Sequence, residues 1–298
     1  MMIGILIFSD PAHEMASGSV RLVEAIETLG HTSIKLYESL FTIESDQGKL
    51  ILHYDGKMFV APEVIIARPN FVQEPSQHAI LLDALNAIGV PVLNGDATGL
   101  VISKNKLTQR LLFSKNNLAM PAWAISRAPD EALAAAKRIG FPVMIKIPFG
   151  THGTGVFYAD QPETFSPIAD YLAVRDGNPA IVEKFVSAAN RCDLRVFVLQ
   201  GKVIAAMERH ARAGDVRANA SIGGTGTPVI LSKDEEALAI RAAEICHLAI
   251  AGVDILRGTN GPLLIEINAN PGFSELEKAT RIDIAHAIVS AAVSLAKG

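Results

Sequence analysis

Residues 251–272, AGVDILRGTNGPLLIEINANPG, contain two apolar runs separated by a turn signal. The runs cover residues 253–256 and 262–268, and the glycines between them predict a hairpin. Residues two apart in a strand share a face, so Glu266 and Asn268 point the same way. The apolar faces coincide only if paired residue numbers sum to an even value. A sum of 520 suits the turn and places Asp254 opposite Glu266.

This register gathers two carboxylates and an amide on one patch. Like charges opposed across a strand pair are destabilising, and a cation would resolve the repulsion. Carboxylate and amide oxygens, with no thiol or imidazole, suit Mg²⁺ and not zinc. The alternative is an exposed polar face that pairs with Lys or Arg. The turn Asn270-Pro271-Gly272, which ends the second strand beside the patch, makes that alternative less favourable.

Composition limits the class of protein. The chain has 298 residues, of which 49% are hydrophobic and 19% are charged. This length predicts about two domains or one larger body, with ample core, and excludes a disordered chain. The formal net charge of −4 does not favour bulk nucleic-acid binding. The apolar run 1–8 is expected to be a strand and not a signal peptide, and residues 284–296 are too few to span a bilayer.

The cysteines and histidines are sparse. Cys192 and Cys246 form no CxxC pair, so we expect neither a metal set nor a disulfide. None of the eight histidines has a ligand spacing such as H-x-x-x-H, and we assign His152 and His210 no chemical role. A reduced, soluble, cytoplasmic protein is expected.

Strands and helices alternate along the first ninety residues, which predicts a small open α/β sheet. Asp55-Gly56 predicts a hairpin within it. A small middle unit and a C-terminal α+β unit follow. We predict an N-terminal α/β domain over residues 1–98, a central subdomain over 99–178 and a C-terminal subdomain over 179–298.

A glycine-rich loop, GTHGTGV at 150–156, follows a strand that ends in Lys146. Glycines let backbone N–H groups converge on an anion such as a triphosphate. The loop is not a Walker A motif, because Val156 stands where Lys-Ser/Thr should follow. No G-x-G-x-x-G follows the first strand, which disfavours a nicotinamide dinucleotide fold. A plain turn and a solvated lysine are the alternatives.

Arginines also collect between this loop and the acidic hairpin. Arg195 and Arg209 lie on two strands joined by the turn Gly201-Lys202, and Arg212 and Arg217 follow. Arginine offers a fixed donor fork to phosphate or carboxylate. Each one taken alone is expected at the surface, but several in one segment favour anion binding.

An ordered series of motifs resembles the ATP-grasp superfamily, and within it the RimK-type α-L-glutamate ligases, which modify a ribosomal protein. The resemblance is strong from about residue 104 to the end and concerns layout more than motif before that. The motifs are SKNKL (103–107), IK (145–146), GTHGTGV (150–156), VEKFV (182–186), CDLR (192–195), GDVRAN (214–219), AGVDILR (251–257) and EINANPG (266–272).

The resemblance implies a fold in which ATP lies between two α+β units. It implies phosphate contacts from Lys106, Lys146 and the loop glycines Gly153 and Gly155, and ribose binding by Asp193. It also implies an adenine-binding hinge strand of Glu183, Lys184 and Phe185 and a nucleotide site near Arg217 and Asn219. Catalytic charges are implied on Arg209 and Arg217. The implied ligands of two Mg²⁺ or Mn²⁺ ions are Asp254, Glu266 and Asn268.

The resemblance also implies a reaction. An ATP-dependent carboxylate–amine ligase would form an amide bond through an acyl phosphate, with glutamate added to a protein C-terminus, peptide or metabolite. Lys184, Asn270 and His152 depart from the usual residues of the branch, and we match the family's arginine after the fourth N-terminal strand to Arg68. No nucleic acid or membrane partner is expected. A homo-oligomer (dimer or tetramer) is expected.

Two other functions stay open. One is a ligase of the same chemistry for a dipeptide, a glutathione-like product or a carrier protein. The other is a non-catalytic ATP-binding regulatory protein of the synapsin kind.

Overall fold

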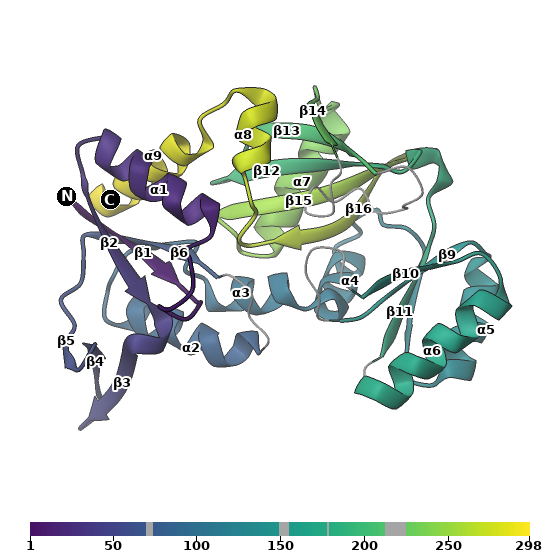
Figure 1. Cartoon of the computed structure of the whole chain (residues 1–298), viewed down its shortest axis with the longest axis horizontal. Coiled ribbons are helices and arrows are strands. Elements are labelled where there is room, and N and C mark those ends of the chain that lie inside the picture. Colours follow the sequence, from purple (N-terminus) through teal and green to yellow (C-terminus); the bar gives the residue numbers. More distant parts are fainter. Residues whose placement is uncertain (70–73, 149–154, 178, 212–224) are drawn as a thin grey trace.

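The computed structural model describes residues 1–69, 74–148, 155–177, 179–211 and 225–298. Figure 1 shows an N-terminal sheet at one end, a central sheet at the other, and a C-terminal sheet between and above them. The expected combination of α/β and α+β layers is therefore confirmed.

The N-terminal sheet is parallel, with the order β2-β1-β6-β7. Ile3, Ile5 and Ile7 of β1 face α1 and α9, whereas Leu6 faces α2, as alternation along a strand requires. Helices on both faces explain why β6 is apolar and buried up to its last residue, Arg68. The elements are β1 (Met2–Ile7), α1 (Ser17–Thr28), β2 (Thr32–Tyr37), β6 (Val64–Arg68), α2 (Pro75–Ala87) and β7 (Val92–Leu93).

A three-stranded antiparallel sheet is inserted after β2, with the order β3-β4-β5. Asp55 and Gly56, both with positive φ, form the predicted hairpin turn between β4 and β5. The sequence did not predict β3, whose alternating side chains are mostly half-buried or exposed. The elements are a 3₁₀ turn (Glu38–Leu40), β3 (Phe41–Asp46), β4 (Lys49–Tyr54) and β5 (Lys57–Met58).

The central sheet is antiparallel, with the order β10-β9-β11-β8, and α5 and α6 cover one face of it. The other face carries Lys146 at the end of β9 and Glu183 on β11. Two helices, α3 and α4, lead into this unit. The elements are α3 (Ala97–Lys104), α4 (Lys106–Lys115), β8 (Trp123–Ser126), α5 (Pro129–Ile139), β9 (Val143–Lys146), β10 (Val156–Ala159), α6 (Pro162–Asp176) and β11 (Ala180–Lys184).

The C-terminal sheet is antiparallel, with the order β14-β13-β12-β15-β16. Alanines of α7 pack on one face of it. Figure 1 shows α8 over the opposite side from α7, near β13. The elements are a 3₁₀ turn (Ser187–Ala189), β12 (Cys192–Leu199), β13 (Lys202–His210), β14 (Thr225–Pro228), α7 (Lys233–Ile245), β15 (Ile250–Gly258), β16 (Gly261–Asn268), α8 (Ser274–Thr280) and α9 (Ile284–Lys297).

The β15–β16 register confirms one prediction and corrects another. Asp254 pairs with Glu266, as predicted, and Val253 pairs with Ile267. Toward the turn, however, Gly258 pairs with Gly261, so the pairing is one residue off the predicted sum of 520. A bulge beside Asp254 separates the two registers and leaves Ile265 as the extra residue. The two-residue turn requires paired residue numbers with an odd sum, whereas alignment of the apolar faces requires an even sum. The bulge allows both pairings in one hairpin.

The C-terminal helix joins the two ends of the chain. Ile288 and Val289 of α9 share a hydrophobic cluster with Ile5 of β1 and Leu22 of α1. Figure 1 places the two termini close together on this side of the molecule. The boundaries 1–98, 99–178 and 179–298 stay a prediction.

Among the described residues, no single helix has the length and apolar character needed to cross a membrane. Helices α8 and α9 pass that test only as a pair, and they are bent by 114°.

Gln109 connects α4 to the acidic hairpin. This buried side chain donates to the carbonyls of Ile267, Ile102 and Ser103 and accepts from the Ile267 N–H. Gln109 lies one helical turn after Lys106, and Ile267 follows Glu266. The amide therefore fixes the helix that carries the predicted lysine against the strand that carries the predicted metal ligand.

Replacing this amide should weaken the fold. We expect Gln109→Leu to lower the free energy of unfolding by about 2–3 kcal/mol, because it leaves the Ile267 N–H and carbonyl unpaired in the core. Urea unfolding measures the change. The control is Gln77→Leu at an exposed position of α2, with an expected change within about 0.5 kcal/mol. Equal stabilities of the two variants would contradict the conclusion that Gln109 fixes α4 against β16.

Candidate active site

A buried ion-pair cluster joins the central sheet to α4. The Glu183 carboxylate, 2% exposed, accepts from Arg110 and, at 2.5 Å, from the ammonium of Lys146. Burial by itself would raise the pKa of Glu183, but Arg110 and Lys146 outweigh it and hold that pKa below its usual value. The resemblance implied that the hinge at Glu183 meets adenine mostly through backbone groups, and that contact stays a prediction. The side chain of Glu183 holds Lys146.

Lys106 begins α4 and points at the acidic hairpin. Asn105 caps the helix, and its Oδ1 accepts from the N–H groups of Leu107 and Thr108. The Lys106 ammonium lies 3.5 Å from Glu266 Oε2. Burial opposes ionisation of Glu266, but Lys106, followed by Lys146, outweighs it and lowers the Glu266 pKa to about 2. The two predicted lysines, from different units of the fold, therefore act on one carboxylate.

Asp254 lies in a second ion-pair cluster on the same face of the C-terminal sheet. Arg195 donates to both of its oxygens, at 2.6 and 3.0 Å, and Arg209 Nη2 lies 3.0 Å from Oδ2. Arg209 also grips Asp193 with two hydrogen bonds of 2.6 and 2.8 Å. The two carboxylates outweigh burial and raise the pKa of Arg209, so this arginine stays charged.

Asp193 is the carboxylate of this cluster whose pKa is raised. Burial raises its pKa, and the nearby charge of Asp254 adds to the effect, while Arg209 opposes it. The resemblance implied that Asp193 binds the ribose of a nucleotide and that Arg209 carries a catalytic charge. The structure brings them together as a mutual pair.

The three predicted metal ligands lie on neighbouring strands. Asp254 and Glu266 are directly paired, and Asn268 is two residues further along β16. An all-oxygen set of two carboxylates and one amide matches the donors that Mg²⁺ or Mn²⁺ takes. Asp254 already accepts three charge-assisted hydrogen bonds, and a carboxylate has about four acceptor positions. The Oδ1 of Asn268 accepts from the Asn270 N–H. The donor chemistry therefore suits a divalent ion that shares these oxygens with the arginines.

Of the glycine-rich loop, the structure describes Gly155 and Val156, where β10 begins. Gly155 has φ +74°, and its carbonyl accepts from the Ile147 N–H at 3.0 Å. A Cβ on Gly155 would lie 2.3 Å from Ile147 Cδ1, so glycine is required at this position. The expectations for Gly153, His152, Arg212, Arg217 and Asn219 lie outside the described residues.

The predicted hinge continues from β11. Lys184 Nζ donates to the carbonyls of Gly140 and Phe141, and Phe185 packs edge-on against Tyr158. The N–H groups of Lys184 and Phe185 donate to Ala122 and Pro142. These two backbone donors are thus occupied within the protein, and the expected contact of the hinge with adenine stays a prediction.

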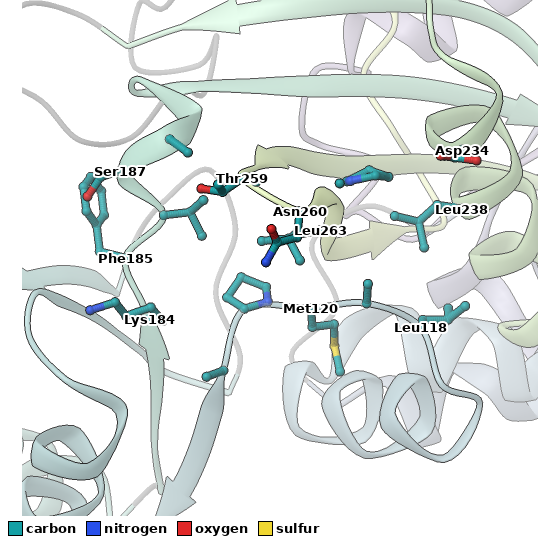
Figure 2. Close-up of a pocket in the computed structure, with 18 of the residues that line it drawn as sticks. Leu118, Met120, Lys184, Phe185, Ser187, Asp234, Leu238, Thr259, Asn260 and Leu263 are labelled. Carbon is teal, nitrogen blue, oxygen red and sulfur yellow. The ribbon is translucent and has the colours of Figure 1, made fainter.

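An open groove of about 910 Å³ runs behind the hinge (Figure 2). It lies between the hinge, the segment 118–122, helix α7 and the β15–β16 turn. Figure 2 shows the amine of Lys184 turned away from the other labelled side chains. The charged residues Lys106, Lys146, Asp254 and Glu266 are not among the described residues that line it, so the groove and the charged cluster are separate features.

Sequence reasoning missed Arg110, which is 1% exposed. Its signal was a spacing of four residues from Lys106, which places both cations on one side of α4. The described cluster thus holds five cations and four carboxylates. The resulting surplus of one positive charge favours an anionic ligand.

Comparisons with known proteins show the family and the fold of this chain. A family model described as a RimK-like ATP-grasp domain matches residues 103–292. The chain is 33% identical, over 91% of its length and 89% of the other protein, to a probable alpha-L-glutamate ligase of Thioalkalivibrio sulfidiphilus. It is 32% identical, over 97% and 94% of the two lengths, to a protein of the same name from Aliivibrio fischeri.

Solved structures show the same fold over the whole chain. The ATP-grasp ligase PsnB complexed with a minimal precursor has a TM-score of 0.75 at 17% identity and covers 98% of each chain. A RimK domain ATP-grasp protein from Sphaerobacter thermophilus has a TM-score of 0.71 at 16% identity, over 98% of this chain and all of the other.

The fold and the matching family model define an ATP-grasp protein. This chain belongs to the RimK-like ATP-grasp family, and it is an ATP-dependent ligase that forms carbon–nitrogen bonds. Ligases of this fold use ATP together with divalent metal ions.

Low pH should remove the contribution that the ion pairs of Glu183 make to the free energy of unfolding. Its native pKa lies below the unfolded value of about 4.3, so its ion pairs stabilise fully above that pH and are lost as the pH falls through the native pKa. We expect Glu183→Gln to be less stable than the parent by about 3–5 kcal/mol at pH 7, because Arg110 and Lys146 lose their counter-charge.

Urea unfolding at a series of pH values tests this expectation. The gap between parent and variant should narrow steadily below about pH 4. The exposed Glu163 of α6, changed to Gln, provides the control and should leave stability nearly unchanged at every pH. A gap that is independent of pH would show that the charge of Glu183 is not the cause.

Proposed function

We propose that this chain couples ATP cleavage to amide-bond formation between a carboxylate and an amino acid, with glutamate as the favoured amino acid. The named relatives, called probable alpha-L-glutamate ligases, support glutamate. The similar PsnB structures, complexed with precursor peptides, support a peptide or protein as the acceptor.

One observation carries the proposal. Lys106 from α4 and Lys146 from the central sheet converge on Glu266, the residue paired with Asp254. Cations from two units facing paired carboxylates can neutralise a triphosphate and a divalent ion together. Phosphoryl transfer needs such positioning and charge neutralisation more than it needs a protein nucleophile.

The proposed reaction has two steps. An oxygen of the substrate carboxylate attacks the γ-phosphorus of ATP, the bond to the β-phosphate oxygen breaks, and an acyl phosphate and ADP form. The amine then attacks the acyl carbon, phosphate leaves with the bonding electron pair, and the nitrogen loses a proton as the amide forms. Arg209, held at a fixed angle by Asp193, is positioned to stabilise negative charge in this region.

Asp254, Glu266 and Asn268 would hold Mg²⁺ or Mn²⁺. When bound, the metal supplies positive charge to phosphate oxygens. Lys146 would hold a phosphate oxygen, and its hydrogen bond to Glu183 holds that ammonium in place. The glycine-rich loop would close over the nucleotide and exclude water, which hydrolyses an acyl phosphate.

A buried arginine supports a binding place for the substrate carboxylate in the N-terminal unit. Arg68 is 2% exposed, and its Nε and Nη1 have no hydrogen-bond partner among the described residues. Its guanidinium lies over the Phe273 ring, 5.4 Å from the centroid, and packs against Gly18 at the start of α1. Burial lowers the pKa of Arg68 to about 10, yet it is charged at neutral pH. A buried guanidinium with unused donors is best satisfied by an anion.

Lys104 links this arginine to the charged cluster. Burial, together with the charges of Lys106 and Arg68, lowers the pKa of Lys104 to about 8. Lys104 is therefore near enough to both Arg68 and Lys106 for their charges to act on it. We infer that Arg68 and Lys104 receive the anionic substrate on the N-terminal side of the site.

An assay of ADP release tests the reaction. The protein is incubated with ATP, Mg²⁺, glutamate and a panel of peptide and metabolite acceptors, and mass gain of the acceptor is followed with ADP. We expect ADP to appear only with an acceptor and an amino acid. Glu266→Gln should lower the rate at least about 100-fold, equivalent to about 3 kcal/mol of transition-state stabilisation.

The matched control for this variant is Glu275→Gln, an exposed carboxylate of α8, which should keep the parental rate. ADP release that is indifferent to every amino acid and acceptor would exclude the ligase. Tight ATP binding without any turnover would favour the regulatory alternative.

The role of Arg68 has a separate expected signature. Arg68→Met keeps most of the side-chain volume over Phe273 but removes the donors. We expect the KM for the acceptor or glutamate to rise about 10-fold or more, with the KM for ATP unchanged, since a charged hydrogen bond contributes about 1.5–3 kcal/mol. Steady-state kinetics with each substrate varied in turn measures this. Parallel changes in both KM values would argue against carboxylate recognition.

A further inference from the structure

A thiol, an imidazole and a carboxylate meet outside the proposed active site. Cys192 Sγ lies 3.0 Å from His210 Nδ1, and His210 Nε2 lies 3.3 Å from Glu208 Oε1. One ligand atom from each of the three residues lies within 4.8 Å of the others. All three side chains are half-buried.

These residues lie on the far side of the C-terminal sheet from the proposed active site. Cys192 and His210 are directly paired across β12 and β13, and Glu208 is two residues before His210. Their neighbours Asp193 and Arg209 project from the opposite face into the charged cluster, because successive side chains alternate. Leu194, on the same face as Cys192, belongs to the core under α7.

The cluster could in principle be a nucleophile with its base. The environment of the thiol argues against that function. Burial raises the pKa of Cys192, and the nearby carboxylates Glu208 and Asp193 raise it further, so the thiol is not activated at neutral pH. The same two carboxylates that disfavour an isolated thiolate favour a cation bound beside it.

We propose that Cys192, Glu208 and His210 form a zinc site, in which the thiolate sulfur, an imidazole nitrogen and a carboxylate oxygen bind the ion. Zn²⁺ takes this mixed set of ligands, with water in a fourth position. Binding replaces the thiol proton, which is released to solvent, and involves no oxidation or reduction.

The surroundings orient the ligands. Arg257 Nη1 donates to Glu208 Oε2 at 2.8 Å, which turns Oε1 toward His210. Arg257 is itself paired with Glu235 of α7 at 2.7 Å, so its charge is compensated beside the site. A hydrogen-bonded carboxylate ligand of this kind is typical of metal sites.

The sequence did not predict this site. Cys192 and His210 are 18 positions apart and match no ligand spacing, and only the antiparallel pairing of β12 with β13 makes them neighbours. A metal here would link the ends of these two strands one residue away from the Asp193–Arg209 pair. The proposal does not depend on the proposed ligase reaction.

Cobalt titration of the purified full chain tests the proposal. Co²⁺ bound to a thiolate gives a charge-transfer absorption in the near ultraviolet, whereas Co²⁺ at an all-oxygen site such as Asp254 and Glu266 does not. We expect this band to saturate at one ion per chain and to disappear when Zn²⁺ is added. Cys192→Ser and His210→Ala should lose the band.

Two controls separate this site from others. Cys246→Ser, which alters the other cysteine, buried under α7, should keep the band. Glu266→Gln should also keep it, because that residue belongs to the proposed catalytic metal site. Circular dichroism of each variant establishes that it is folded.

A second measurement does not depend on cobalt. Zn²⁺ should raise the melting temperature of the parent and of Glu266→Gln, and a chelator should reverse the rise, because a ligand that binds only the folded chain stabilises it. Folded Cys192→Ser should show no rise. A band that persists in Cys192→Ser, or no band in the parent at excess Co²⁺, would overturn the zinc site.

Discussion

The pairing of Asp254 with Glu266 is the constraint on which the rest of the site depends. Two carboxylates opposed across a strand pair repel each other, and removing them from water adds to the cost. Cations from several elements of the fold compensate the two negative charges. Arg195 and Arg209 come from the same sheet, and Lys106 comes from α4, so the helix must dock on the sheet for the charges to balance.

The second carboxylate centre extends the same principle across the units. Glu183 lies on the central sheet, and its partners Arg110 and Lys146 come from α4 and β9. Helix α4 therefore contributes a cation to each centre, one turn apart, and Gln109 between them is hydrogen-bonded to the backbone of β16. Electrostatic balance and hydrogen bonding thus place the central and C-terminal sheets relative to each other through one helix.

A site built from compensated charges is prepared for a charged ligand. Asp254 and Glu266 are each held by cations, so the proposed metal–nucleotide complex would join an existing network and would not meet bare carboxylates. Arg68 differs, because it is buried with unused donors beside an aromatic ring. Its Nε and Nη1 have no hydrogen-bond partner among the described residues, and an anionic substrate would accept from these donors.

Much of this could be predicted from the amino-acid sequence. Alternation in two short strands predicted that Asp254 faces Glu266, because the period of a strand is a local property. The predicted register failed toward the turn, where a two-residue turn and the apolar faces demand different parities and a bulge resolves the conflict. The order of the motifs placed the chain among the ATP-grasp proteins, which the family comparison confirms.

The sequence by itself determined the fold class, the acidic hairpin and the lysines that serve it, since local periodicity and residue chemistry carry that information. Only the tertiary structure decided the partners of the charges. It paired Glu183 with Arg110 across 73 positions, and it made Cys192 and His210 neighbours. Partner choice depends on which strands and helices dock, and docking is set by the burial of whole apolar faces, which no short pattern encodes.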